Sequence, residues 1–117
     1  MKEQNIIVEK SKKFALRTIN LYKYLCENQK MFPIANQVLR SGTSIGANVR
    51  EAKRGQSKPD FYAKLGIALK EADETEYWLE LLYESDYISK EQFDSIYSDC
   101  EEIIKLLVAI IKTRNNS

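Results

Sequence analysis

Apolar and small side chains recur at helical spacing along most of this chain. From residue 61 to residue 82 they follow alternate steps of four and three, which is the period of one helix face. These positions are Phe61, Leu65, Ala68, Ala72, Thr75, Leu79 and Leu82. A similar period joins Phe93, Ile96, Cys100, Ile103, Leu107 and Ile110, and a third set is Ile7, Phe14, Thr18, Leu21 and Leu25. The pattern predicts helices over about residues 5–28, 58–85 and 89–114.

Two of these helices have recognisable starts. Ser89 and Gln92 have the spacing of a capping box, in which each side chain bonds the other residue's free backbone N–H. Ser57 and Pro59 suit the first turn of the preceding helix, and the negative charge of Asp60 suits the positive end of its dipole.

The stretch from Leu39 to Gly55, LRSGTSIGANVREAKRG, is rich in weak helix formers. Its apolar residues nevertheless keep helical phase, provided that Ser41 fills one core position. The positions in phase are Ile34, Val38, Ile45, Val49 and Ala52. Pro33 can open such a helix, and Gly55 is expected to end it in a left-handed conformation. We therefore predict a second helix over residues 33–54.

Gly42 and Gly46 lie four residues apart, on one face of this predicted helix. Each glycine costs about 1 kcal/mol of helix stability relative to alanine. A close backbone contact should offset that cost. The contact is either with another helix of the same chain or with another subunit.

The predicted fold is all-α: a single domain, residues 1–117, that forms an antiparallel up-down-up-down four-helix bundle. Apolar residues make up 44% of the chain and charged residues 30%, as in ordinary globular proteins. No apolar run reaches the roughly 20 residues of a membrane span, and the first residues lack a signal-peptide core. We expect a cytoplasmic protein without membrane contacts.

Charge is polarised along the sequence. Residues 1–70 hold 14 Lys and Arg against 5 Asp and Glu, whereas residues 71–117 hold 4 against 12. Basic residues on the first helix and around the second turn are predicted to share one pole, where they could form a nucleic-acid-binding patch. They are Lys10, Lys12, Lys13, Arg17, Arg50, Lys53, Arg54, Lys58 and Lys64. Alternatively, the basic half complements the acidic half within the fold or between subunits.

A polar row accompanies the core row of the second helix and consists of Arg40, Ser41, Ser44, Asn48 and Glu51. One interpretation is a buried network in which these side chains bond across helices and Glu51 takes a basic or tyrosine partner. The other is a functional site, with Arg40 and Arg50 at its solvent edges.

Histidine, the commonest general base and metal ligand, is missing from the sequence. A glycine loop for phosphate is not predicted either, because Gly42 and Gly46 lie inside a helix. We therefore expect no enzymatic activity, no catalytic residues, no metal site and no cofactor.

The segments LRSGTSIGANVREA and DFYAKLGIALKEADETEYWLELL resemble the four-helix-bundle family of 23S rRNA intervening-sequence proteins. The similarity runs from about Phe14 to Leu107. Its pattern comprises Arg40-Ser41, Ser44-Ile45, Asn48, Glu51, Phe61, Leu65, Ile67-Ala68, Glu71, Glu76 and Trp78-Leu79. Where many relatives read AEG, this chain reads Arg50-Glu51-Ala52, which adds a positive charge beside the motif.

The resemblance implies a bacterial protein that assembles as a homopentamer. It also relates the chain to accessory proteins of diversity-generating retroelements, which bind nucleic acid and a reverse transcriptase through basic surfaces. Our leading hypothesis is a non-enzymatic oligomer that binds the RNA or DNA backbone through its basic pole. The alternative hypothesis is a protein-only assembly module whose basic and acidic surfaces pair between subunits.

Overall fold

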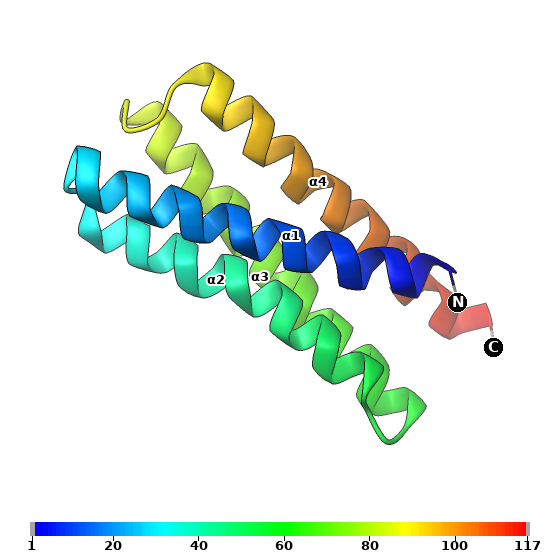
Figure 1. Cartoon of the computed structure of the whole chain (residues 1–117). Helices are drawn as coiled ribbons and strands as arrows, with labels where there is room; N and C mark the ends of the chain where they lie inside the picture. Colours follow the sequence, from blue (N-terminus) through cyan, green and yellow to red (C-terminus); the bar gives the residue numbers. More distant parts are fainter. Residues whose placement is uncertain (1, 117) are drawn as a thin grey trace.

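Four long α-helices pack side by side in the computed structural model, which describes residues 2–116 without the side chains of residues 3 and 116. They are α1 (Lys2–Tyr24), α2 (Phe32–Lys53), α3 (Lys58–Glu84) and α4 (Lys90–Lys112). A π-helical turn, Leu25–Gln29, follows α1, and a 3-10 turn, Thr113–Asn116, extends α4. Each helix runs antiparallel to the one before it, so the chain goes up, down, up and down (Figure 1). The predicted four-helix bundle is confirmed.

The helix ends follow the predicted capping chemistry. Ser89 accepts a hydrogen bond from the Gln92 backbone N–H at 3.1 Å, and the Gln92 side chain accepts one from the Ser89 N–H at 2.8 Å. At the start of α3, Ser57 Oγ accepts from the Asp60 N–H at 3.2 Å. These bonds satisfy backbone donors that have no partner inside the helix.

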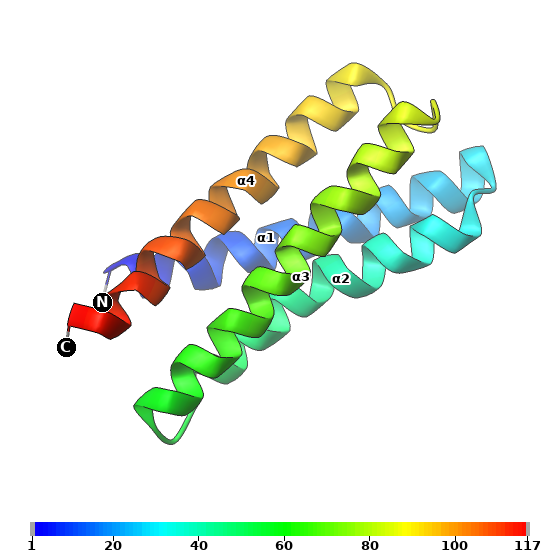
Figure 2. The same cartoon turned by 180° about the vertical axis from the view of Figure 1, so that it is seen from behind.

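The core lies where the periodic positions predict it. The predicted core positions of α4 are buried from Ile96 to Ile110, and those of α3 from Leu65 to Leu82. The first position of each series, Phe61 and Phe93, is only half-buried, and the neighbouring Tyr62 is buried instead. Figure 2 shows the same four helices from behind, with both termini at one end of the bundle.

Gly42 and Gly46 bring α1 and α2 together within one chain. A Cβ on Gly42 would meet Thr18 Cγ2 at 2.4 Å, and one on Gly46 would meet the Ser11 carbonyl oxygen at 3.3 Å. Both neighbours belong to α1. The close contact is therefore intramolecular, which is one of the two alternatives that the sequence left open.

The prediction for Gly55 is wrong in one respect. No glycine of the described chain has a positive φ; Lys30 at 52° and Asp86 at 68° take the left-handed positions instead. A Cβ on Gly55 would lie 2.7 Å from Asp60 Oδ2 and 3.1 Å from the Ala52 carbonyl oxygen. A side chain at residue 55 would thus crowd the Asp60 carboxylate and the end of α2, and the glycine does not provide a left-handed conformation.

Candidate functional site

An open groove with a volume of about 1000 Å³ lies over α2, between α1 and the start of α3. Small residues of α2, namely Thr43, Gly46 and Ala47, contribute to its lining. The other lining residues are Lys12, Ala15, Arg50, Glu51, Arg54, Gly55, Gln56, Ser57, Asp60 and Lys64. Because these small side chains project little from α2, a ligand can approach the helix backbone closely.

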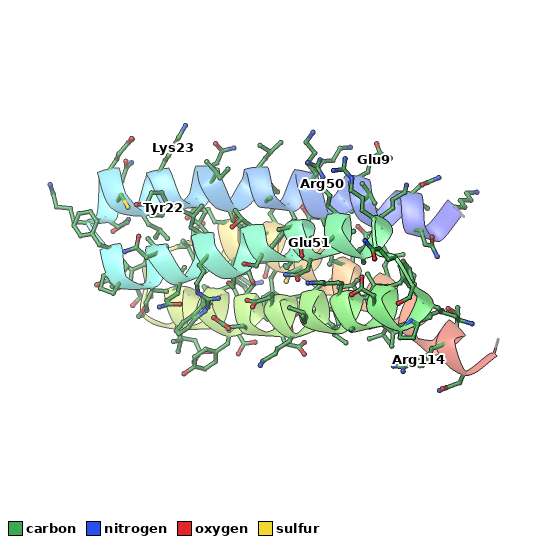
Figure 3. The ribbon with its side chains drawn as sticks, turned by 90° about the horizontal axis from the view of Figure 1, so that it is seen from below. Glu9, Tyr22, Lys23, Arg50, Glu51 and Arg114 are labelled. Carbon is green, nitrogen blue, oxygen red and sulfur yellow. The ribbon has the colours of Figure 1, made fainter. Side chains whose placement is uncertain are left out.

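Two rows of side chains on α2 give the groove two different sides. Gly42 and Gly46 face α1, and Arg50 and Arg54 continue that row in steps of four residues. Glu51 belongs to the other row, which faces α3, and its carboxylate pairs with Lys64 Nζ at 3.0 Å. Figure 3 shows Arg50 on the α1 side of α2 and Glu51 toward α3. Glu51 is therefore turned toward α3 relative to Arg50, and Arg54, three residues after Glu51, lies beside it on the groove-facing surface of α2.

The side chains of three cations of the groove, Lys12, Arg50 and Arg54, form no ion pair or hydrogen bond within residues 2–116. All three are exposed. Their positive charges are consequently available to an anionic ligand without breaking an internal contact.

The remaining predicted basic residues do not share this groove. Lys10 pairs with Glu102 of α4 at 2.8 Å, and Arg17 pairs with Asp99 at 2.6 Å while also bonding Ser95. Hydrogen bonding to Glu102 raises the pKa of Lys10. Lys13 lines a smaller hollow of about 170 Å³ that these α4 carboxylates also line.

The two other basic residues of the set lie nearer the groove end of the bundle. Lys53 donates a hydrogen bond to Asn5 at 2.8 Å, and Lys58 is the first residue of α3. Of the nine cations, four therefore line the groove, three lie on the α1–α4 side, and Lys53 and Lys58 belong to neither group. The sequence could place them at one end of the bundle, but it could not show which helix each side chain faces.

The polar row of α2 is a buried network at only one point. Ser41 is fully buried and accepts a hydrogen bond from Thr75 Oγ1 of α3 at 2.8 Å. Ser44 and Asn48 instead donate to carbonyl oxygens of their own helix, at 2.7 and 2.8 Å. Glu51 does take a lysine partner, but it remains exposed.

Arg40, the first residue of this row, is exposed and forms ion pairs with α3. Its guanidinium pairs with Glu71 at 3.2 Å and also with Glu74, and its Nε donates to Gln37. Glu74 also accepts a hydrogen bond from the indole N–H of Trp78 at 3.0 Å. The sequence analysis did not identify Glu74 as a partner of Arg40 and Trp78. Glu74 does lie four residues before Trp78, a spacing that indicates contact between two side chains on a helix.

Carboxylates gather on the opposite side of the bundle, between α3 and α4. Burial, together with the negative charges of Glu101, Asp73 and Glu80, raises the pKa of Glu76 to about 7. Glu80 accepts a hydrogen bond from the Tyr97 hydroxyl at 2.7 Å. Burial, this hydrogen bond and the neighbouring carboxylates raise the pKa of Tyr97.

Within residues 2–116, no group of three or more Cys, Asp and Glu side chains is arranged to hold a metal ion. Cys26 and Cys100 are both free thiols, and burial raises the pKa of Cys100. None of the described helices is both long enough and apolar enough to span a membrane.

Comparison with known proteins assigns the chain to a family. A solved structure from Bacteroides thetaiotaomicron, described as a protein of unknown function from the S23 ribosomal protein family, shares 58% sequence identity with a TM-score of 0.94. The match covers 95% of this chain and 99% of that one. A search of curated proteins found no match. The family model for the 23S rRNA-intervening sequence protein matches residues 3–109, and the chain therefore belongs to that family.

Proposed function

We propose that this protein is a non-enzymatic, self-associating accessory factor that binds the phosphate backbone of nucleic acid in the groove over α2. The observation that supports this function best is a set of three exposed cations, Lys12, Arg50 and Arg54, whose side chains have no partner among the residues that the structure describes. Phosphate contacts of this kind position a nucleic acid without reading its sequence.

The groove favours backbone recognition over base stacking. Its lining includes no aromatic side chain among the described residues. Proteins that hold single strands usually stack bases on aromatic rings, which contribute about 1–3 kcal/mol per base. Structured or duplex nucleic acid is therefore the better candidate ligand.

Salt dependence tests this proposal directly. Neutralising three phosphates predicts a log–log slope of about −2.7 for B-DNA, so affinity should fall roughly 40-fold between 50 and 200 mM salt. Fluorescence anisotropy of labelled duplexes at the two salt concentrations measures the effect. Absence of binding at 50 mM salt would refute the proposal.

Matched charge variants locate the interface. Arg50→Gln with Arg54→Gln should weaken binding strongly, because both residues line the groove. Lys10→Gln with Arg17→Gln removes the same charge but affects cations paired with α4. The double variant Lys10→Gln, Arg17→Gln should bind nucleic acid almost as tightly as the unchanged protein does. Equal losses from the two pairs would place the ligand elsewhere.

A second candidate function is a protein-only assembly module, and the outer face of α3 favours it. Gly66 is exposed in mid-helix, and a Cβ there would meet nothing within 4 Å. Ile67 and Tyr77 are also exposed, by 42% and 53%. A helical glycine with no packing reason inside the chain, beside exposed apolar residues, is expected where another subunit approaches. The resemblance implies a homopentamer and a reverse transcriptase partner. Under this second candidate function, they are the assembly and the protein partner that we propose.

Charge reversal separates the two functions. Lys53→Glu with Arg54→Glu should leave the oligomer intact and abolish nucleic-acid binding if the groove binds phosphate. If basic and acidic surfaces pair between subunits, the same change should break the oligomer. Size-exclusion chromatography with light scattering, run beside the anisotropy titration, gives both results.

A further inference from the structure

The two sides of the groove have different chemistry, and this difference bears on which nucleic acid fits. This inference rests on the proposed binding of nucleic acid. Within residues 2–116, the side chains of Lys12, Arg50 and Arg54 have no partner; Lys12 and Arg50 lie on the α1 side, and Arg54 lies between that side and Glu51. Glu51 and Asp60 place carboxylates on the α3 side of the same groove. A ligand that fills the groove must suit both sides at once.

Phosphate groups do not suit the α3 side. An ionised carboxylate accepts hydrogen bonds and repels other anions. Lys64 is the one cation of α3 in the groove lining, and its charge is already balanced by Glu51 at 3.0 Å. The ligand atom that contacts the Glu51 carboxylate itself must therefore be a hydrogen-bond donor, whereas a neighbouring phosphate can lie on Arg54, three residues away.

Glu51 is able to accept such a bond. Its side chain is 57% exposed, and only its Oε1 atom contacts Lys64. The second carboxylate oxygen has no hydrogen-bond partner within residues 2–116. An incoming donor can thus bind Glu51 while the ion pair with Lys64 stays in place.

We propose that the groove selects RNA over DNA, with phosphates on Lys12, Arg50 and Arg54 and a ribose 2′-hydroxyl donating to Glu51. The 2′-hydroxyl is the donor that accompanies the phosphates along an RNA strand, and DNA lacks it. Asp60 is the second acceptor on the same side. Glu51 is therefore the residue that determines sugar specificity.

Chemically matched duplexes test this inference. Three labelled duplexes of one sequence are titrated by fluorescence anisotropy: RNA, fully 2′-O-methylated RNA and DNA. Methylation keeps the phosphates and the A-form but removes the donor hydrogen. Because a hydrogen bond to a charged group contributes about 1.5–3 kcal/mol, RNA should bind at least about tenfold more tightly than its methylated form.

Glu51→Ala distinguishes a lost hydrogen bond from crowding by the methyl group. The variant should bind RNA and methylated RNA equally, because the acceptor is gone. It should also bind DNA more tightly than the unchanged protein does, because Lys64 is released. Glu102→Ala is the matched control, since it breaks an exposed Glu–Lys pair outside the groove. This control should keep the preference for RNA.

Each result has a distinct meaning. Equal binding of RNA and methylated RNA by the unchanged protein overturns the sugar specificity while leaving backbone binding intact. A preference that persists in Glu51→Ala shows that Glu51 is not its cause, which also overturns the inference. If none of the three duplexes binds at low salt, both the inference and the proposed function fail.

Discussion

Gly42 of α2 lies so close to Thr18 of α1 that a Cβ on residue 42 would sit 2.4 Å from Thr18 Cγ2. This contact sets the separation of the first two helices. Steps of four residues lead from Gly42 through Gly46 to Arg50 and Arg54, and each step turns the row about 40° further from α1. The close packing that joins the helices therefore also fixes where the groove arginines emerge.

Gly42→Ala should lower the free energy of unfolding by about 1–3 kcal/mol, because the added methyl group overpacks the contact with α1. This loss should exceed the gain of about 1 kcal/mol in helix propensity. Urea denaturation followed by circular dichroism measures the difference. Thr18→Ala removes the closest atom. It should therefore lower the free energy of unfolding less in the Gly42→Ala variant than in the unchanged protein. An unchanged stability for Gly42→Ala would contradict the contact.

Gly66→Ala should have the opposite effect on stability. Nothing lies within 4 Å of the position that its Cβ would take, so the helix should gain about 1 kcal/mol. If α3 meets another subunit at this face, self-association should weaken although the monomer becomes more stable. Urea denaturation and sedimentation velocity at several concentrations give the two values. Unchanged association would remove Gly66 from the proposed subunit contact.

Thr75→Val should destabilise the protein by about 1–3 kcal/mol, because the buried Ser41 hydroxyl loses its partner across the α2–α3 interface. Ser41→Ala in the same chain removes the unpaired hydroxyl. The double variant should therefore cost less than the sum of the two single changes. A double-mutant cycle in urea measures this coupling. Strict additivity would show that the two hydroxyls do not interact.

Glu76 should make stability depend on pH. Its pKa of about 7 lies above the ordinary value of 4.5, so between these pH values the folded chain binds more protons than the unfolded chain. The free energy of unfolding should consequently fall as pH rises from 4.5 to 7, by about 1 kcal/mol after solvent screening is allowed for.

Glu76→Gln checks this assignment, because it removes the titrating group. The variant should lose that part of the pH dependence and be more stable than the unchanged protein at pH 8. Urea denaturation at pH 5, 6, 7 and 8 gives the comparison, with Glu84→Gln at the exposed end of α3 as control. A Glu76→Gln curve parallel to that of the unchanged protein would assign the pH dependence to other groups.

Much of the fold could be predicted from local spacing. The capping box at Ser89 and the core positions from Leu65 to Leu82 depend on residues a few places apart, and both were confirmed. The second helix was also predicted, despite its many weak helix formers, because its apolar residues keep a helical period. Family membership was recognised from the combined motif on α2 and α3.

The candidate site was predictable only in composition. The sequence indicated that Arg17 and Arg50 belong to a basic half. It did not indicate that Arg17 would pair with Asp99, or that the Arg50 side chain would have no partner in the described part of the chain. The same limit applies to Gly55, whose close neighbour Asp60 is visible only once the turn is folded.

The sequence by itself determined the four helices, their caps and the core face of each, because helical period and capping act over a few residues. The tertiary structure decided which charged side chains form ion pairs. It paired Lys10 with Glu102 and Lys64 with Glu51, and it left Arg50 open in the groove. Those outcomes depend on the register and rotation of packed helices, which arise from long-range contacts such as that of Gly42 with Thr18.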